Sequence, residues 1–198
     1  MKNLVRGELR IVAGQWRGRR LRFRDSNELR PTPDRVRETL FNWLQADIAG
    51  SRCLDLFAGS GALGFEAASR GAGKVLMVEQ DLETVAGIRE NIELLGADQI
   101  HVFCENTMNF LADAKSTRDR LCSQPFDLVF VDPPYRSNLV GECCELLEQG
   151  QWLSDHAKIY VEYDIHLDLS KMPEGWVCLK SKKAGSVGYS LYQKSNSL

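Results

Sequence analysis

Short apolar runs recur along the chain from residue 52 onward, and each is followed by a segment of helical length. The runs are too short for helices and lack polar alternation, so they predict strands that are buried on both faces of a sheet. They are Cys53–Phe57, Lys74–Glu79, Ile100–Cys104, Phe126–Asp132 and Lys158–Tyr163. Helices are expected at 61–70, 82–96, 107–121 and 137–149. This alternation indicates a parallel sheet covered by helices on both faces.

The end of the chain departs from this alternation. Trp176–Ser181 and Gly188–Gln193 are two strand candidates that only a short loop joins. A parallel connection needs a crossover of a dozen or more residues, so these two strands should pair antiparallel. The pattern therefore predicts a Rossmann-like α/β fold, with a mostly parallel seven-stranded sheet that ends in an antiparallel hairpin.

The residues before 52 predict smaller elements. Leu9–Ala13 and Arg19–Phe23 flank a glycine-containing stretch and are expected to form a small β-hairpin. Residues 30–33 should be extended, because each residue before a proline is pushed out of the α region. Thr32 can then cap a helix that has Pro33 in its first turn. The apolar stripe of this helix, with Arg35 and Arg37 off it, consists of Val36, Leu40, Phe41 and Leu44.

Charge is distributed unevenly over a chain whose formal net charge is only −2. Residues 1–40 hold 11 Lys and Arg against 5 Asp and Glu, whereas the remainder holds 14 against 22. A basic segment on an acidic body is expected when one end of a protein meets a polyanion. Trp16 and Phe23 lie among the arginines, and aromatic and guanidinium faces both stack on bases. We therefore divide the chain into a basic arm, residues 1–30, and a main domain, residues 31–198; a solvated charged tail is the alternative for the arm.

Length and composition limit the class of protein. The 198 residues suit a single domain, and the six cysteines show no CxxC spacing, so buried thiols are expected rather than a metal or disulfide site. No apolar run approaches the ~20 residues that a membrane crossing needs. The start has no secretory signal pattern. We therefore expect a cytoplasmic protein that binds no metal.

A glycine-rich loop follows the first strand of the main domain and opens a helix. Gly59, Gly61 and Gly64 match GxGxxG, and Glu79 ends the next strand 20 residues after Gly59. This spacing fits a nicotinamide dinucleotide as well as S-adenosylmethionine, with the acidic residue on the ribose hydroxyls. Asp55 favours S-adenosylmethionine, because its carboxylate would repel a pyrophosphate and attract a methionine ammonium. The short stretch after the loop also leaves little room for the second half-sheet of a dehydrogenase.

The fourth strand ends in the tetrapeptide Asp132-Pro133-Pro134-Tyr135. Two consecutive prolines cannot continue a sheet ladder, so they end the strand and stiffen the loop. The carboxyl ends of parallel strands line the ligand crevice, which places Asp132 beside the ligand of the glycine loop. Hydrogen bonds to Asp132 and the Pro133 carbonyl would aim the lone pair of a base amino group at a methyl donor, and Tyr135 would stack on the base. The tetrapeptide thus predicts methyl transfer to an exocyclic amino group, without a metal.

These motifs resemble the amino-group methyltransferases of the Rossmann-like class, in which a D-x-F-x-G-x-G loop precedes a [D/N/S]PP[Y/F/W] tetrapeptide. The strings R-I-V-A-G-Q-W-R-G-R-R-L (10–21) and R-P-T-P-D-R-V-R-E-T-L-F-N-W-L (30–44) are similar to one branch of that class. That branch is the bacterial RsmD-type 16S ribosomal RNA guanine-N2 methyltransferases, and the similarity extends from Arg10 to about Gln193. It implies S-adenosylmethionine as cofactor and a specific guanine of 16S rRNA, in the assembled 30S subunit, as methyl acceptor.

The resemblance also implies a set of site residues. The catalytic positions are Asp132, Pro133 and Tyr135. The cofactor-binding positions are Asp55, Phe57, Gly59, Gly61, Glu79 and Asn106. The family commonly has Gly-Asp where this chain has Glu105-Asn106, and Asn106 would contact the adenine amino group. The positions that would face RNA or close the active site are Arg10, Arg17, Arg19, Arg20, Thr32, Arg35 and Arg37.

Two other functions fit the same motifs. One is a DNA adenine-N6 or cytosine-N4 methyltransferase, although the chain has no room for the extra domain that duplex readout often needs. The other is a non-catalytic RNA-binding assembly factor, although the intact tetrapeptide argues for catalysis. For the leading function we expect a monomer that binds RNA and neither a membrane nor a metal.

Overall fold

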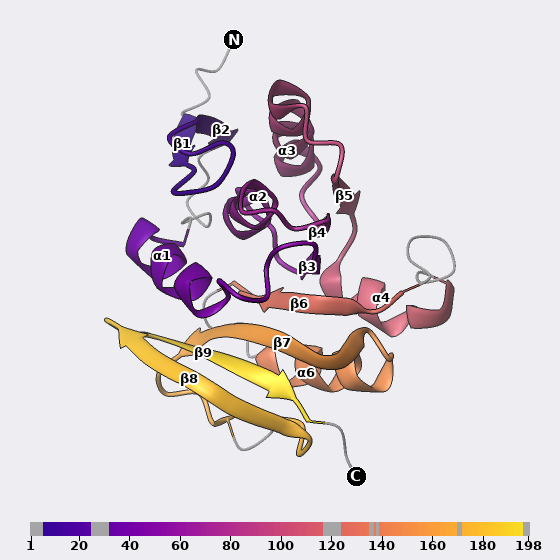
Figure 1. The fold of residues 1–198 in the computed structure, drawn as a ribbon. Coiled ribbons are helices and arrows are strands. Elements are labelled where there is room, and N and C mark those ends of the chain that lie inside the picture. The colour runs from indigo at the N-terminus through magenta and orange to yellow at the C-terminus, as the bar shows by residue number, and fades with distance from the viewer. Residues whose placement is uncertain are drawn as a thin grey trace.

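The centre of the computed structural model is a seven-stranded sheet in the order β5-β4-β3-β6-β7-β9-β8 (Figure 1). The residues described are 6–24, 32–116, 124–134, 137, 139–169 and 172–195. The parallel strands are β3 (Arg52–Asp55), β4 (Lys74–Glu79), β5 (Ile100–Cys104), β6 (Phe126–Val131) and β7 (Leu153–Asp164). Antiparallel pairing joins β7 to β9 (Val187–Lys194) and β9 to β8 (Trp176–Ala184). The predicted α/β fold with a terminal antiparallel hairpin is confirmed.

Helices cover both faces of this sheet, which explains why its strands are almost entirely apolar. Along β6, Leu128 and Phe130 belong to one buried cluster, and Val129 and Val131 belong to the other. The first cluster is completed by α1 (Asp34–Trp43), α2 (Ala62–Ser69) and α3 (Leu82–Leu95). The second is completed by α4 (Thr107–Ala112) and α6 (Val140–Gln149). Helix α4 ends before the expected limit of residue 121, and residues 117–121 lie outside the described part.

The N-terminal hairpin packs onto the helical layer instead of standing apart from it. Its strands β1 (Arg6–Arg10) and β2 (Arg20–Arg24) pair antiparallel, and Leu9, Ile11 and Leu21 are buried in the same cluster as α1 and α2. Figure 1 shows the hairpin beside α2 and α3. The domain boundary expected at residue 30 lies outside the described residues.

The first hairpin strand begins and ends earlier than the predicted Leu9–Ala13. The backbone N–H groups of Val12 and Ala13 donate to the two carboxylate oxygens of Glu66 on α2, at 2.8 and 3.0 Å, instead of to a strand partner. The distant Glu66 side chain therefore takes the place of a strand partner here, and the local sequence does not predict where β1 ends.

The cysteines follow the expected burial only in part. Cys53, Cys143 and Cys144 are buried, whereas Cys104 and Cys178 are exposed, and these five are free thiols; Cys122 lies outside the described residues. Within the described ranges no group of three or more His, Cys, Asp or Glu is placed to hold a metal ion. None of the helices in the same ranges is long and apolar enough to cross a membrane.

The strand order reverses next to β3, and this reversal positions the site. From β3 the chain proceeds outward through β4 to β5, and β6 then returns to the other side of β3. The connections leaving β3 and β6 therefore diverge, and in open α/β sheets the ligand crevice lies at the carboxyl ends of the strands at this point. The glycine loop follows β3, and Asp132 follows β6.

Candidate active site

The loop after β3 depends on glycine at three positions. Gly59 and Gly61 have φ of 50° and 79°, in the left-handed region that side chains disfavour. A Cβ on Gly61 would lie 2.6 Å from Cε2 of Phe65, and one on Gly64 would lie 2.3 Å from Cε of Met77. Gly61 thus allows the turn into α2, and Gly64 allows α2 to approach β4 closely.

Glu79, at the end of β4, ties this strand to the glycine loop. Its Oε2 accepts the backbone N–H of Gly59 at 2.9 Å, and its Oε1 accepts the N–H of Asp81 at 2.9 Å. Each carboxylate oxygen has a second lone pair, and the side chain is partly exposed, so Glu79 can also accept from ribose hydroxyls. This donor and acceptor set fits a nucleoside cofactor.

Asp55 lies beneath the loop instead of at its surface. It is 2% exposed, and its Oδ2 accepts the backbone N–H of Gly64 at 3.1 Å. Burial raises the pKa of Asp55 to about 7, and the nearby Asp132 carboxyl adds to the rise. Asp55 therefore holds the start of α2 in place, and its role toward the methionine part of the cofactor stays a prediction.

Asn106, at the end of β5, has a structural role that sequence reasoning missed. Its Oδ1 accepts the backbone N–H groups of Met108 and Asn109, at 3.0 and 3.3 Å, so it is the N-cap of α4. Its Nδ2 donates to Oε1 of Gln80 at 3.1 Å, and both side chains are exposed. The pattern of Asn directly before a helix could have revealed the cap. An adenine contact would thus involve the Asn106–Gln80 pair.

Phe57 and Gly59 are partly exposed at the loop, whereas Gly61 is buried. The Phe57 ring packs against the cluster beneath α4 and α6. Of the loop positions assigned to the cofactor, Phe57 and Gly59 are therefore the ones that a ligand in the crevice can reach.

Asp132 follows the last residue of β6 and receives a hydrogen bond from a distant segment. Oγ1 of Thr32 donates to its Oδ2 at 3.2 Å. Burial raises the pKa of Asp132 to about 6, while the Thr32 hydrogen bond opposes the rise. The prediction that Thr32 caps α1 is wrong, because Pro33 is the N-cap and makes no side-chain cap. Thr32 instead donates its hydroxyl hydrogen to the Asp132 carboxyl, and its closing of the active site stays a prediction.

The rest of the tetrapeptide is described only in part. Pro133 is partly exposed and Pro134 is exposed, so both residues are accessible at the end of β6. Tyr135 lies outside the described residues, and its stacking role stays a prediction.

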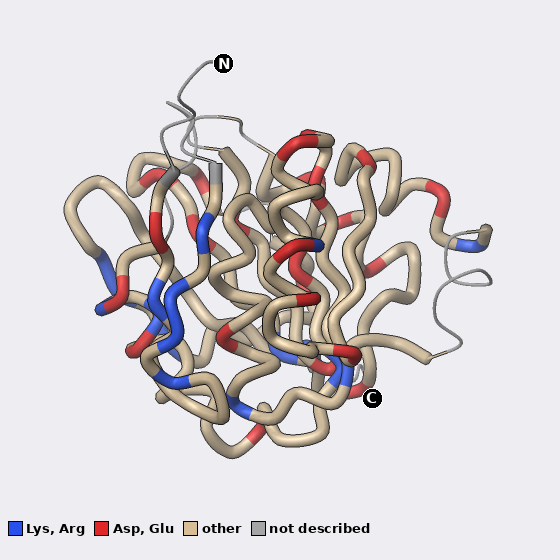
Figure 2. The backbone as a smooth tube through the Cα atoms, turned by 90° about the horizontal axis from the view of Figure 1, so that it is seen from above, with Lys and Arg blue, Asp and Glu red and all other residues tan. Residues whose placement is uncertain are grey.

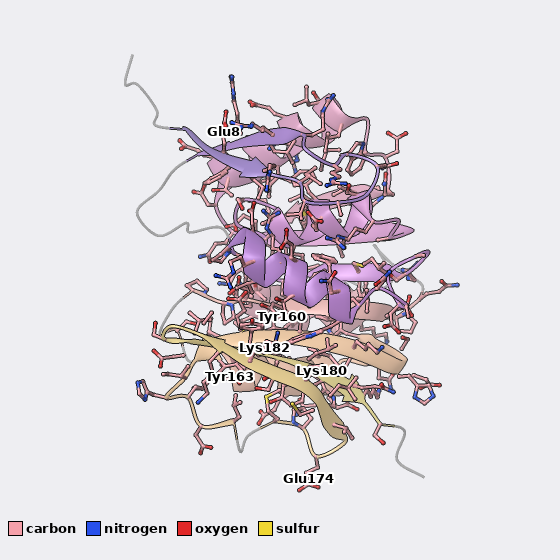
Figure 3. The ribbon with its side chains drawn as sticks, turned by 60° about the vertical axis from the view of Figure 1, so that its left-hand side comes forward. Glu8, Tyr160, Tyr163, Glu174, Lys180 and Lys182 are labelled. Atoms are coloured by element: carbon pink, nitrogen blue, oxygen red, sulfur yellow. The ribbon has the colours of Figure 1, made fainter. Side chains whose placement is uncertain are left out.

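A further carboxyl group, that of Glu162 on β7, lies beside Asp132 and was not predicted. Oη of Tyr160 donates to Oε1 of Glu162 at 2.6 Å. Figure 3 shows Tyr160 on β7, just below α1 in the view. Burial, and next the Asp132 carboxyl, raise the pKa of Glu162 to about 8. The sequence feature that could have revealed Glu162 is its position as an acidic residue near the end of the apolar run Lys158–Tyr163.

Five of the six arginines assigned to RNA are exposed. They are Arg10, Arg17, Arg19, Arg20 and Arg35. Two of them form surface ion pairs, Arg10 with Asp34 at 3.3 Å and Arg20 with Glu8 at 2.9 Å. Figure 2 shows Lys and Arg gathered on the left of the view, on the side from which the N-terminus emerges. These side chains can contact a polyanion.

The sixth arginine, Arg37, is inside the protein, and its assignment to RNA is wrong. It is 1% exposed, and it donates to the backbone carbonyls of Thr32 and Arg10, at 3.2 and 2.9 Å. It also pairs with Asp34 at 2.5 Å and lies 3.5 Å from Glu66, which is fully buried. Arg37 therefore joins the N-terminal segment to α1 and α2.

The chain is similar to several known proteins. The model of the family described as Conserved hypothetical protein 95 matches residues 9–193. The chain is 47% identical to Ribosomal RNA small subunit methyltransferase D of Escherichia coli (strain K12), over 95% of this chain and 91% of that protein. The solved structure of yhhF from Escherichia coli is similar with a TM-score of 0.86 and 44% identity, covering 96% of this chain and 100% of that one.

A more distant solved structure shares the fold alone. It is an RNA methyltransferase from Salinibacter ruber in complex with S-adenosyl-L-homocysteine, with a TM-score of 0.62 and 17% identity. The match covers 85% of this chain and 96% of that one.

Proposed function

The chain belongs to the Conserved hypothetical protein 95 family, that of the RsmD-type ribosomal RNA methyltransferases, and from this premise we propose that it methylates 16S ribosomal RNA. The methyl group comes from S-adenosylmethionine, and the acceptor is the exocyclic N2 amino group of a specific guanine. We extend the proposal to the assembled 30S subunit as substrate, a monomeric enzyme and a cytoplasmic location.

The observation that supports this most directly is the place of Asp132. It is a partly exposed carboxyl group at the switch point of the sheet, next to the glycine loop and followed by two prolines. S-Adenosylmethionine, when bound, supplies an electrophilic methyl group. Asp132 and the Pro133 carbonyl accept hydrogen bonds from the two N–H groups of the amino group, and these bonds direct its lone pair toward the methyl group. Asp132 also stabilises the positive charge that develops on the nitrogen during transfer.

The cofactor has a consistent set of partners around this point. Glu79 accepts from the ribose hydroxyls, and the Asn106–Gln80 pair binds the adenine amino group. Phe57 and Gly59 face the crevice, and Asp55 supports the loop from below. The exposed arginines of the hairpin bind phosphates of the RNA.

The decisive experiment is methyl transfer with a labelled cofactor to 30S particles from a strain that lacks the modification. We expect label in 16S rRNA, and nuclease digestion with mass spectrometry should locate it at N2 of one guanine. Unlabelled particles, or label on adenine or cytosine, would contradict the proposal. As a control for the cofactor class, S-adenosylhomocysteine should raise the Tm, whereas NAD should not.

Activity should fall at low pH because Asp132 must be ionised to accept a hydrogen bond. Its pKa is raised to about 6, so kcat/KM for 30S particles should decrease as the pH falls through that value. Thr32→Val provides the control. The Thr32 hydroxyl stabilises the Asp132 carboxylate. Its loss should therefore raise the pKa of Asp132, so that the decrease of kcat/KM at low pH begins at a higher pH. An unchanged pH of onset would show that another group titrates.

Three exposed arginines at the tip of the hairpin, in the loop and at the start of β2, should set the salt dependence of RNA binding. Replacing Arg17, Arg19 and Arg20 with alanine removes three phosphate contacts, and the slope of log affinity against log salt should become shallower by about two. Filter binding of 16S rRNA at several salt concentrations measures this slope. Lys74→Ala on β4, outside the hairpin, is the matched control. An unchanged slope in the triple variant would show that the hairpin is a solvated charged surface that does not bind RNA.

A further inference from the structure

We propose that Glu162 is a specificity-determining residue that contacts N1 and O6 of the target guanine while Asp132 contacts N2. The inference rests on the proposed function and deepens it, because it assigns the recognition of the rest of the base edge to a residue that no motif contains.

The register of the sheet places the two carboxyl groups side by side. In the parallel pair β6–β7, Val131 lies opposite Val161. Asp132 directly follows Val131, and Glu162 directly follows Val161. Directly paired residues of neighbouring strands point to the same face, so both side chains leave the sheet on one face. The Asp132 carboxyl raises the pKa of Glu162, which agrees with this proximity.

That face is the one covered by α1. Two residues before Asp132, the ring of Phe130 lies 5.9 Å from that of Phe41 on α1. Tyr160, two residues before Glu162, is buried in the same cluster. Because side chains alternate along a strand, Asp132 and Glu162 point to this face too, at the end of the strands where the crevice lies.

A structural role does not account for Glu162. A buried carboxyl group is stabilised by a cation or by several hydrogen-bond donors, yet within the described residues its hydrogen-bond donor is Tyr160 alone and no Lys or Arg forms an ion pair with it. The lysine of β8 that is in register with Glu162 through Tyr189 is Lys182, and its Nζ lies over the Trp43 ring at 5.9 Å. Glu162 remains partly exposed, so a base in the crevice can reach it.

The pair should carry one proton near neutral pH. The titratable groups that face Glu162 are Asp132 from β6, Tyr160 from β7 and Tyr189, its register partner on β9. Burial raises the pKa of both carboxyl groups, and the Asp132 carboxyl raises the pKa of Glu162 further, so we place the shared proton on Glu162. Asp132 is then an acceptor only, while Glu162 is both a donor and an acceptor.

This arrangement matches guanine. Along its edge guanine presents two donors, the N2 amino group and N1–H, and then an acceptor, O6. The carboxylate of Asp132 accepts from N2, and the neutral carboxyl of Glu162 accepts from N1–H and donates to O6. Adenine and cytosine present a ring-nitrogen acceptor beside their amino group, so they do not offer the donor that Glu162 accepts from.

The test compares Glu162→Gln with Glu162→Leu in methyl transfer to 30S particles across a pH series. Glutamine keeps one donor and one acceptor, so kcat/KM at pH 7 should stay within about threefold of the wild type. Leucine removes two hydrogen bonds and should lower it by about 30-fold. The wild-type kcat/KM should also decrease above pH 8, where Glu162 loses its proton, and Glu162→Gln should lose this alkaline limb.

Tyr160→Phe gives a second measurement that does not depend on the stability of the leucine variant. The Tyr160 hydroxyl lowers the pKa of Glu162, so its removal should shift the alkaline limb to higher pH. Affinity for S-adenosylhomocysteine should be the same in all of these variants. An alkaline limb that persists in Glu162→Gln, or full activity of Glu162→Leu, would overturn the inference. If the wild-type protein transfers no methyl group, the proposed function itself fails. That result differs from failure of the inference on Glu162, in which the wild type is active and the variants behave otherwise than expected.

Discussion

Replacing Asp132 with alanine should lower kcat by about 10²- to 10³-fold while leaving the affinity for S-adenosylhomocysteine nearly unchanged. The amino group of a base is a weak nucleophile, because its lone pair is delocalised into the ring. An acceptor at Asp132 directs that lone pair and stabilises the charge that develops during transfer, so the interaction grows stronger in the transition state. Removing such an interaction lowers kcat and kcat/KM together.

The matched control for this variant is Asp127→Ala, at the opposite end of β6. The carboxylate of Asp127 accepts the backbone N–H of Arg52 and the hydroxyl of Ser154, both at 2.9 Å. Its loss should lower the free energy of unfolding by roughly 1–3 kcal/mol and leave kcat unchanged. Single-turnover transfer to 30S particles and calorimetric titration with S-adenosylhomocysteine measure the two effects. A collapse of cofactor affinity in Asp132→Ala would place this residue in the cofactor site instead.

Replacing Arg37 with alanine should cause the largest loss of stability, roughly 3–5 kcal/mol in the free energy of unfolding. The guanidinium is 1% exposed and lies 3.5 Å from Glu66, which is 0% exposed. Its removal leaves that carboxylate buried beside fewer compensating charges. It also releases the carbonyls of Arg10 and Thr32 from the hydrogen bonds that hold the N-terminal segment to α1.

Arg35→Ala is the control, because Arg35 precedes Arg37 by two residues on the same helix but is exposed. It should leave the unfolding free energy within about 0.5 kcal/mol of the wild type and weaken RNA binding. Urea denaturation followed by fluorescence separates the two variants. Since Thr32 also contacts Asp132, Arg37→Ala should lower activity as well. Equal stability of the two variants would show that Arg37 does not join the N-terminal segment to the core.

The amino-acid sequence by itself determined the sheet and the place of the site. Five apolar runs and a terminal pair predicted seven strands, since a strand buried on both faces must be apolar at nearly every position. GxGxxG and the two prolines after Asp132 marked the two loops that meet at the switch point. Both features are local, because glycine and proline act on the backbone at their own positions.

Tertiary structure alone decided the roles that depend on what packs against a side chain. Arg35 and Arg37 both lie off the apolar stripe of α1, yet one is exposed and the other is buried, because the hairpin and Glu66 cover only one side of the helix. Thr32 donates to Asp132 across 100 residues of chain instead of capping its own helix. Glu162 joins the site only because β7 lies beside β6. Such contacts join segments that are distant in the chain, so no local pattern of residues contains them.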